Sequence, residues 1–486
     1  MIITRIERVP LLGMRYPGVF LPALLVSTVV IALDTDPLFS IARAELTEEV
    51  LLSTKVGVDA YQTARHDLTE KNKKIFQEGH AQFNEAWVLA PEPGGVWGLG
   101  PTFNEDRCAA CHRNNGRAAA PGDNTFAELG VVVRLSMPGE TQQGGPVPHP
   151  TYGDQLQNRG IASRVPAEGQ AKIRYSTTSV RLPDGEVIEL RKPEVIFEEL
   201  AFGQIGSDTR TSIRVAPSMI ALGLLEAVPE AVLKTIQAAQ SRYEMAGRTN
   251  RVWDIEKDSW TIGRFGWKAS QPSLRQQIAS AFHSDIGATS YMFPEENCPT
   301  AQQACRDLPS ASKCGGQGGC TGNLYRPEVN PVRLNSITFY LQNLAAPSRR
   351  QAEDEQIRRG ETLFAAARCS VCHVPQMKSV QKLGSTNRDV IIQPYTDLML
   401  HDMGDGLADY RPDFSASGYE WRTAPLWGIG LQKKVSGHTD LLHDGRARNV
   451  LEAILWHGGQ SEKSVEIFKS LKKSERDSLV KFVESL

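Results

Sequence analysis

Net charge and long apolar runs are both scarce in this chain. Its 54 basic and 56 acidic residues give a formal net charge of -2 over 486 residues, so composition offers no electrostatic support for a nucleic-acid partner. Beyond the N-terminal region, no segment is long and apolar enough for a membrane span, which needs about 20 residues. The 41% content of hydrophobic residues is ordinary for a soluble globular protein, and the length allows two or three domains.

The N-terminal region is predicted to be an export signal. Arginines precede an apolar run of 15 residues, Val19 to Leu33, which contains Pro22 and is followed by the small residues of Ala42-Arg43-Ala44. Because the run is shorter than a membrane-spanning helix, we expect residues 1–44 to be a cleaved signal peptide and the mature protein to be periplasmic. An uncleaved anchor is the alternative, since the stretches on both sides of the apolar run are long.

Cysteine is also scarce, and its eight residues form two groups. Four belong to two Cys-x-x-Cys-His motifs, made by Cys108, Cys111 and His112 and by Cys369, Cys372 and His373. The other four lie within 23 residues of a glycine-rich segment, at Cys298, Cys305, Cys314 and Cys320. In an oxidising compartment this second group predicts two disulfides, with three possible connectivities. A zinc site is less favoured, because none of the four stands in a Cys-x-x-Cys pair.

Each Cys-x-x-Cys-His motif supplies what the covalent attachment of a c-type haem requires. Two thiols on one short turn can add to the two vinyl groups, and the adjacent imidazole can reach the iron. One such motif would arise by chance with a probability of about 0.003 in this composition. A thioredoxin-like pair or half of a zinc site would leave the histidine unexplained twice. We therefore expect two covalently bound haems, with His112 and His373 as proximal ligands.

The sequence around the two motifs is similar, which indicates an internal duplication. A helix is expected before each motif and another at the end of each half, and a short Arg-x-Ala-Pro segment follows each motif. The matching segments are, in pairs, 75–83 and 357–364, 214–217 and 422–425, and 337–344 and 479–486. These matches predict two cytochrome-c-like domains rather than one domain with two haems.

The polar segment Pro347–Gln356 marks the expected domain boundary. We expect an N-terminal cytochrome-c-like domain with insertions at 45–346 and a C-terminal one at 347–486. Between Lys172 and Leu190, polar and less polar residues alternate around the turn Pro183-Asp184-Gly185, which predicts a β-hairpin. The predicted fold class is mainly α, with small β insertions in the first domain.

Further motifs make the chain resemble the bacterial di-haem cytochrome c peroxidase and methylamine-utilisation (MauG-like) superfamily, and most closely its di-haem oxidoreductase branch. The resemblance covers nearly the whole mature chain. The segments that carry it, besides the first motif, are 98–104, 223–227, 401–404, 421–428 and 443–448. Some members of this branch are called thiol oxidoreductases, but here every cysteine already has a haem or an expected disulfide.

The resemblance implies a second ligand for the C-terminal haem. In the superfamily, the residue 14 positions past the histidine of a His-Asp-Gly segment ligates the second iron. Counted from His443, that position is His457. A His373/His457 iron would be saturated on both faces and suited to electron transfer. His401, Met403 and His443 itself are the competing ligands.

The resemblance fits the first haem less well. Peroxidases of the superfamily carry a histidine soon after the first motif, whereas here none follows His112 until His149. We expect an open iron at His112, where peroxide or oxygen would bind, with Met137 and His149 as ligands if the site is closed. An open site needs a group that moves protons, and Glu226 in the Gly-Leu-Leu-Glu segment is the predicted distal acid. A surface glutamate is the alternative.

Calcium is possible but not favoured. Superfamily members often hold this ion between the domains with an asparagine two residues before the proline of the first half, and Val215 stands there instead. The acidic Asp402, Asp405 and Asp409 are interpreted as a solvated loop.

The leading functional hypothesis is a peroxidase-like oxidoreductase that takes electrons from a small redox protein. MauG-like or oxygenase-like oxidation of a protein or organic substrate is the first alternative, and pure electron transfer is the second. Aromatic side chains could relay electrons, although core or surface packing is the default interpretation of each. The candidates are Trp97, Trp253, Trp260 and Trp267.

Overall fold

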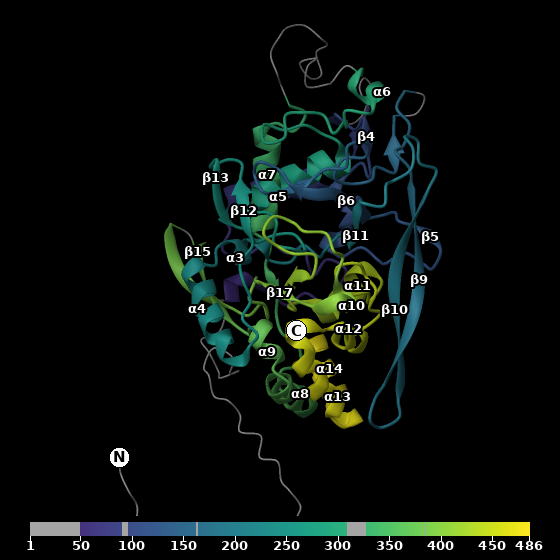
Figure 1. Cartoon of the computed structure of the whole chain (residues 1–486). Helices are drawn as coiled ribbons and strands as arrows, with labels where there is room; N and C mark the ends of the chain where they lie inside the picture. The colour runs from purple at the N-terminus through teal and green to yellow at the C-terminus, as the bar shows by residue number, and fades with distance from the viewer. Residues whose placement is uncertain (1–48, 90–95, 162–163, 309–326, 384) are drawn as a thin grey trace, which may run out of the picture. The chain divides into compact units, whose positions relative to one another are not determined.

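The computed structural model describes residues 49–89, 96–161, 164–308, 327–383 and 385–486 (Figure 1). The predicted signal peptide at 1–44, Cys314 and Cys320 lie outside these ranges. Among the described residues, no helix is both long and apolar enough to cross a membrane. One of the expected disulfides is present and joins Cys298 to Cys305.

The fold is mixed, so the prediction of a mainly α class was wrong. Helix accounts for 32% of the structure and strand for 24%, in many small sheets of two or three strands. The strand content comes largely from the long insertion after the first motif. The same insertion contains β6 (Val131–Glu140) and β11 (Arg210–Val215), which pair antiparallel.

Two crossed helix pairs form the helical parts of the fold. In the first half, α1 (Glu70–Asn84) packs on α7 (Pro331–Gln342), and in the second, α8 (Glu355–Ala366) packs on α14 (Lys473–Ser485). Each crossing has a glycine at the point of closest approach. A Cβ on Gly79 would overlap the carbonyl oxygen of Ser336, and one on Gly360 would overlap that of Ser478. Only glycine allows either crossing, and the shared geometry supports the predicted duplication.

A third helix repeats in each half. α5 (Leu274–Ala281) packs on α7, and α12 (Val450–Trp456) packs on α14. α12 ends directly at His457. α5 instead continues into η4 (Phe282–Ile286), a π-helical turn. The two halves therefore differ where their third helices end.

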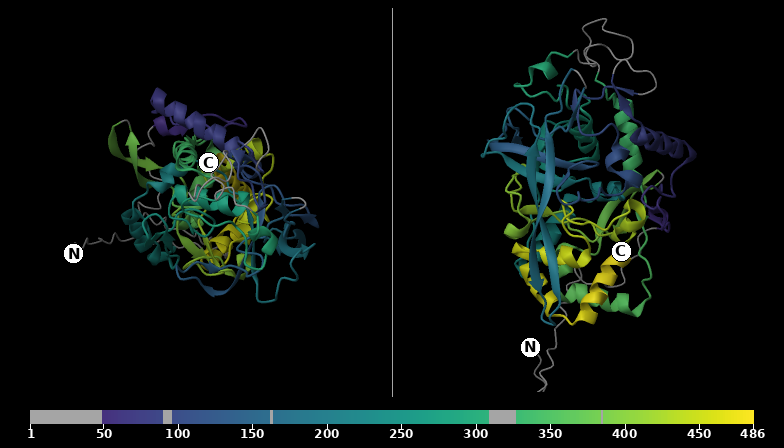
Figure 2. Two further views of the ribbon diagram at one scale, coloured as in Figure 1. Left: turned by 90° about the horizontal axis from the view of Figure 1, so that it is seen from above. Right: turned by 90° about the vertical axis from the view of Figure 1, so that its right-hand side faces the viewer.

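The predicted hairpin is confirmed and longer than expected. β9 (Gln170–Arg181) and β10 (Val187–Glu198) pair antiparallel, and β5 (Thr125–Phe126) joins β9. Figure 2 shows this ribbon extending past the sheets of the first half to the helices of the second. Its tip is anchored there, because Leu182 and Leu190 are buried with the core of α8 and α14.

The remaining elements are short and connect these parts. In chain order they are η1 (Glu49–Leu51), β1 (Leu52–Ser53), β2 (Trp87–Val88), β3 (Val96–Trp97), β4 (Thr102–Phe103), α2 (Cys108–Cys111), η2 (Arg113–Asn115), β7 (Pro146–Val147), β8 (Arg159–Gly160), α3 (Leu222–Glu226), α4 (Glu230–Gln240), η3 (Ser241–Tyr243), β12 (Arg251–Asp254), β13 (Ser259–Ile262), α6 (Gln303–Arg306), β14 (Ala346–Pro347), α9 (Cys369–Cys372), β15 (Met377–Leu383), β16 (Thr386–Ile392), β17 (Leu400–Asp402), α10 (Gly404–Leu407), β18 (Glu420–Arg422), η5 (Ile429–Leu431), α11 (Gln432–Ser436), η6 (Gly459–Ser461) and α13 (Glu462–Ser470).

Candidate functional site

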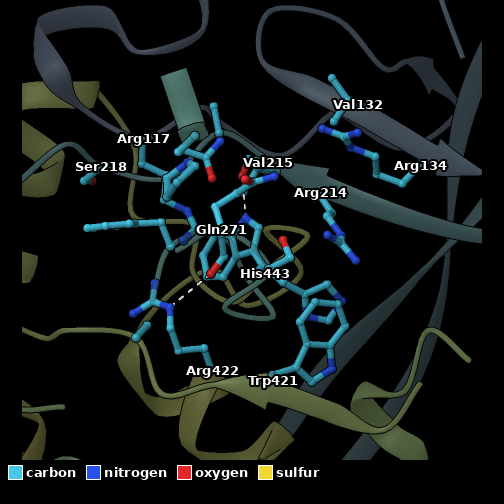
Figure 3. Close-up of a pocket in the computed structure, with 18 of the residues that line it drawn as sticks. Arg117, Val132, Arg134, Arg214, Val215, Ser218, Gln271, Trp421, Arg422 and His443 are labelled. Carbon is cyan, nitrogen blue, oxygen red and sulfur yellow. Dashed lines mark hydrogen bonds between the residues drawn. The ribbon is translucent and has the colours of Figure 1, made fainter. Parts of the chain in front are cut away.

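Both Cys-x-x-Cys-His motifs line one cavity of about 960 Å³. Its wall also includes His457, residues of β6 and β11 from the first half and the Trp421–Trp427 segment from the second. Figure 3 shows part of this wall, where Arg214, Trp421 and His443 lie close together. The structure thus brings together two motifs that are 261 residues apart from Cys108 to Cys369.

The two motif histidines are held in the same way. In each motif, the cysteines occupy a single helical turn, α2 or α9, and the histidine follows it. The Nδ1 atom of His112 lies 2.8 Å from the carbonyl oxygen of Pro217, and that of His373 lies 3.0 Å from the carbonyl oxygen of Tyr395. Donation from Nδ1–H leaves Nε2 as the free acceptor, which is the tautomer that binds a metal.

Burial keeps both rings neutral. It lowers the pKa of His112 and of His373 to about 4. The neighbouring thiols are not reactive either, since burial raises the pKa of Cys108 and of Cys369 to about 12. Each site therefore offers a neutral imidazole close to a thiol that burial keeps un-ionised, Cys108 in the first motif and Cys369 in the second. This donor set fits a haem, and it does not fit thiol–disulfide catalysis.

The second site has an additional imidazole. The ring of His457 faces that of His373, with centroids 6.5 Å apart. An imidazole nitrogen lies about 2.0 Å from a metal that it binds, so rings on opposite faces of one metal have centroids roughly 6.3 Å apart. His457 Nδ1 lies 2.6 Å from the carbonyl oxygen of Ala453, which leaves its Nε2 free as well. The spacing suits one iron between His373 and His457.

The competing ligands His401, Met403 and His443 also line the cavity, but each has other contacts. His401 Nε2 lies 2.7 Å from Asp397 Oδ2, and its Nδ1 lies 3.6 Å from Cys372 Sγ. These three side chains form the one cluster of potential metal ligands among the described residues, but Cys372 belongs to the second motif. Met403 packs against the apolar core of the second half. His443 stacks on Trp421, with ring centroids 3.6 Å apart.

The first site has no comparable arrangement among the described side chains. The ring recorded in contact with His112 is that of Phe83, at 6.3 Å, and its counterpart Phe364 lies 6.4 Å from His373. His149 lines the cavity, but its Nδ1 accepts hydrogen bonds from the backbone N–H groups of Thr151 and Tyr152. Met137 Sδ accepts a hydrogen bond from the hydroxyl of Thr209. The two halves thus provide unequal sites.

Glu226 lies outside the cavity wall. Its carboxylate accepts hydrogen bonds from the backbone N–H of Leu274, at 2.8 Å, and from Gln342 Nε2, at 2.6 Å. It therefore joins α3 to α5 and α7. The structure does not bring this predicted acid together with His112.

Most of the tryptophans predicted as candidate electron relays do not line the cavity. Trp253 and Trp260 pack against each other across β12 and β13, and they and Trp97 are not part of the wall. Trp267 is part of it and donates from Nε1 to the carbonyl oxygen of Val215. Trp421 and Trp427, which were not among the predicted relay residues, also line the cavity. Their place in a motif of the resemblance was the available signal.

The acidic residues considered for calcium do not converge. The Asp402 carboxylate accepts a hydrogen bond from the backbone N–H of Gly404, and the Asp405 carboxylate accepts one from the hydroxyl of Tyr410. Asp409 forms an ion pair with Lys268. The Lys268 ammonium already lies 2.6 Å from Asp409. No ion is needed to neutralise this carboxylate.

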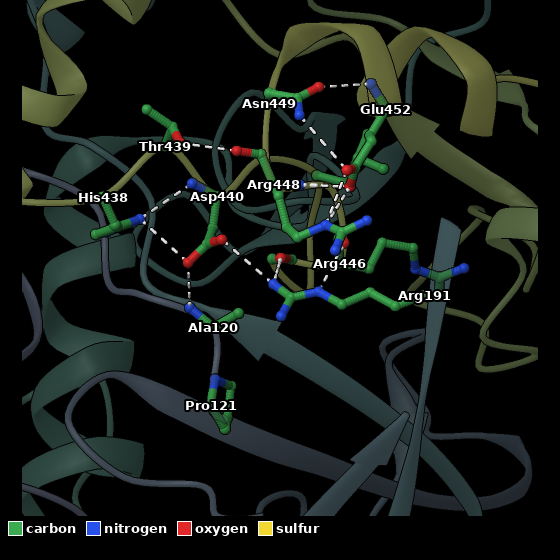
Figure 4. Close-up of polar contacts among 12 residues, drawn as sticks. Ala120, Pro121, Arg191, His438, Thr439, Asp440, Arg446, Arg448, Asn449 and Glu452 are labelled. Carbon is green, nitrogen blue, oxygen red and sulfur yellow. Dashed lines mark hydrogen bonds and ion pairs between the residues drawn. The ribbon is translucent and has the colours of Figure 1, made fainter. Parts of the chain in front are cut away.

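Capping of α12 positions His457 (Figure 4). The Asn449 side chain accepts from the backbone N–H of Glu452 at 2.9 Å, and the Glu452 carboxylate accepts from the N–H of Arg448 at 2.9 Å. Loss of an N-cap costs about 1 kcal/mol. We expect Asn449→Ala to lower the temperature at which the spectrum of the second haem changes on warming.

The matched control is Thr69→Ala, because Thr69 caps α1 through the N–H of Asn72. α1 does not carry His457. A similar change in both variants would contradict the role of the Asn449 cap in holding this ligand.

The unequal pair of sites in one cavity defines a protein built around two haems. Residues 48–486 match the family described as "Di-haem oxidoreductase, putative peroxidase". The chain belongs to this family and is an oxidoreductase. Membership of the family implies that the protein holds two haems. The searches among curated proteins and among solved structures found no match.

Proposed function

We propose that this chain is an exported periplasmic enzyme with two covalently attached haems, which reduces peroxide at the His112 site with electrons received at the His373/His457 site. The observation that carries the proposal is the inequality of the sites. His457 faces His373 at 6.5 Å, whereas the described residues place no second imidazole against His112. An iron with two protein ligands suits electron transfer, and one with an open position can take a substrate.

When bound, the haems supply one-electron transfer and a site for peroxide. Reduction of hydrogen peroxide to two water molecules breaks the O–O bond and consumes two protons and two electrons. The chain's own residues must hold the ligands in place and supply the protons. The carbonyl groups of Pro217, Tyr395 and Ala453 fix the orientation of the three ligand rings. A small redox protein is the proposed electron donor.

Trp421 belongs to the wall of the cavity that both motifs line. Trp421 lies between cationic and aromatic neighbours, with His443 on its face, Lys268 at 4.4 Å and Arg214 at 5.7 Å from its ring centroid. Such cations make the oxidation of an aromatic ring less favourable. These cations therefore disfavour the storage of oxidising equivalents on the Trp421 ring.

The test is to add hydrogen peroxide to the purified protein, with and without a reduced c-type cytochrome, and to record visible spectra. We expect rapid oxidation of the donor. The resting protein should show one low-spin and one high-spin ferric signal by electron paramagnetic resonance. Two low-spin signals and no peroxide response would instead indicate pure electron transfer. A long-lived oxidised pair without donor oxidation would favour the MauG-like alternative.

A further inference from the structure

The turn that follows α5 carries two titratable side chains into the cavity. α5 corresponds to α12, because each packs on the last helix of its half. α12 ends at the ligand candidate His457, whereas α5 passes into the π-helical turn 282–286. Both His283 and Asp285 of this turn line the cavity. π-Helical turns are rare and frequently occur at functional sites. The turn therefore indicates a functional role for this position, where the second half has a ligand candidate instead.

Asp285 is fixed next to the first motif. Its backbone carbonyl accepts from the N–H groups of Asn104, at 2.8 Å, and Glu105, at 3.1 Å, just before Cys108. Its Oδ1 accepts from Gln155 Nε2 at 2.8 Å. Asp285 and Cys111 both line the cavity, and the Asp285 charge adds to the effect of burial, which raises the pKa of Cys111.

Arg134 of β6 is a cationic residue of the same cavity wall (Figure 3). Its guanidinium pairs with Asp154 at 2.6 Å. Burial raises the pKa of Asp285, and Arg134 opposes the rise. A carboxyl group whose pKa is moved toward neutrality can both accept and return a proton.

His283 is turned to a neighbouring loop. Its ring stacks on Phe293, with centroids 5.3 Å apart, and its Nε2 lies 3.2 Å from the carbonyl oxygen of Glu295. Donation to this carbonyl directs Nε2 away from any iron at His112. In the first half, Asp285 and Arg134 are therefore the charged groups near the position that His457 occupies in the second half.

We propose that Asp285 is the catalytic acid–base group of the first site and that Arg134 is the cation beside it. Asp285 takes the proton from the peroxide oxygen nearer to His112 and returns it to the outer oxygen. The O–O bond breaks, and uptake of two electrons from the one-electron donor protein and of two protons from solvent completes the two water molecules. Arg134 stabilises the negative charge that develops on the outer oxygen. This inference rests on the proposed function.

The first experiment measures the second-order rate constant for the reaction of peroxide with the purified protein by stopped-flow spectroscopy. The isosteric Asp285→Asn should slow the reaction by about 100-fold or more, because it cannot exchange the proton. Haem content and the resting spectrum should be unchanged. Asp285→Glu should give an intermediate rate. Asp208→Asn, the same change at an exposed position, is the matched control.

The second experiment measures fluoride binding to the ferric protein by visible spectroscopy, which does not depend on turnover. Loss of a charged hydrogen-bond donor weakens anion binding, so Arg134→Gln should raise the fluoride dissociation constant about tenfold or more. Asp285→Asn should not weaken fluoride binding.

The outcomes separate this inference from the proposed function. If the wild type reacts with peroxide and Asp285→Asn reacts equally fast, the inference is wrong and the proposed function stands. A slow Glu226→Gln beside a fast Asp285→Asn would restore the acid predicted from sequence and overturn Asp285. Unchanged fluoride binding in Arg134→Gln would remove the cation from the site. A wild type that does not react with peroxide would overturn both.

Discussion

Replacement of His457 by alanine is expected to convert the second haem from low spin to high spin while the first keeps its spectrum. The ring of His457 lies 6.5 Å from that of His373, at the spacing of two imidazoles on one metal. Alanine offers no ligand atom, so the iron would keep one protein ligand. The measurement is electron paramagnetic resonance of the resting ferric protein, where the bis-imidazole signal should disappear.

A control and a rescue make this result specific. His66→Ala removes an exposed histidine and should leave both signals intact. His457→Met should restore a low-spin iron with a higher reduction potential, because thioether ligation favours the ferrous state. If the low-spin signal survives in His457→Ala and is lost in His401→Gln, the ligand is His401. His457→Ala should also lose donor-dependent peroxide reduction, because it alters the haem that receives the electrons.

The parts of the site and fold that are built from contiguous residues could be predicted from the sequence. The two thiols and the imidazole of each motif are adjacent in the chain, so the two groups at His112 and His373 could be recognised without a structure. The hairpin of β9 and β10 was predicted for the same reason, because its alternation and turn are contiguous. The helix pairs followed from the repeat, and Gly79 and Gly360 take the same position in both crossings.

The sequence left open the contacts between distant segments. Arg214–Pro217 and Arg422–Pro425 match in sequence, and the Pro217 carbonyl lies beside His112, but the carbonyl beside His373 belongs to Tyr395. The Gly-Leu-Leu-Glu segment suggested that Glu226 faces the haem, but the packing of α3 against α5 and α7 engages its carboxylate. Asp285 stands 173 residues after His112 in sequence, and its approach depends on the α5–α7 contact. No local pattern specifies such contacts.

The mixed fold has a similar origin. Long insertions in the first half must cover a large apolar cavity, and extended segments do this with few residues. β6 and β11 supply wall residues and pair with each other, and the tip of β10 reaches the core of the second half. A count of helix-forming repeats could not reveal these strands, because their burial comes from the cavity and from the other half.

Replacement of Lys268 by methionine is expected to lower the free energy of unfolding by about 3 kcal/mol or more. The side chain of Lys268 is fully buried, and its ammonium donates to Asp409 Oδ1 at 2.6 Å and to the carbonyl oxygens of Arg411 and Ser417 at 2.8 and 2.9 Å. Burial lowers the pKa of Lys268 to about 8, and Asp409 opposes the fall, so the group stays largely charged at neutral pH. Methionine would leave the Asp409 carboxylate with the backbone N–H of Arg411, at 3.0 Å, and with Arg214 as its nearest remaining cation, at 3.7 Å.

Denaturant unfolding with an unchanged slope measures the loss. Lys257→Met is the matched control, because Lys257 also pairs with an aspartate, Asp254, at 2.8 Å but is 72% exposed. An exposed pair contributes below about 1 kcal/mol, so this variant should unfold nearly as the wild type does. The double variant Lys268→Met/Asp409→Asn should recover part of the lost unfolding free energy, because it also removes the buried carboxylate that the single variant leaves without its lysine partner. Equal stability of Lys268→Met and Lys257→Met would show that the buried ammonium does not stabilise the fold.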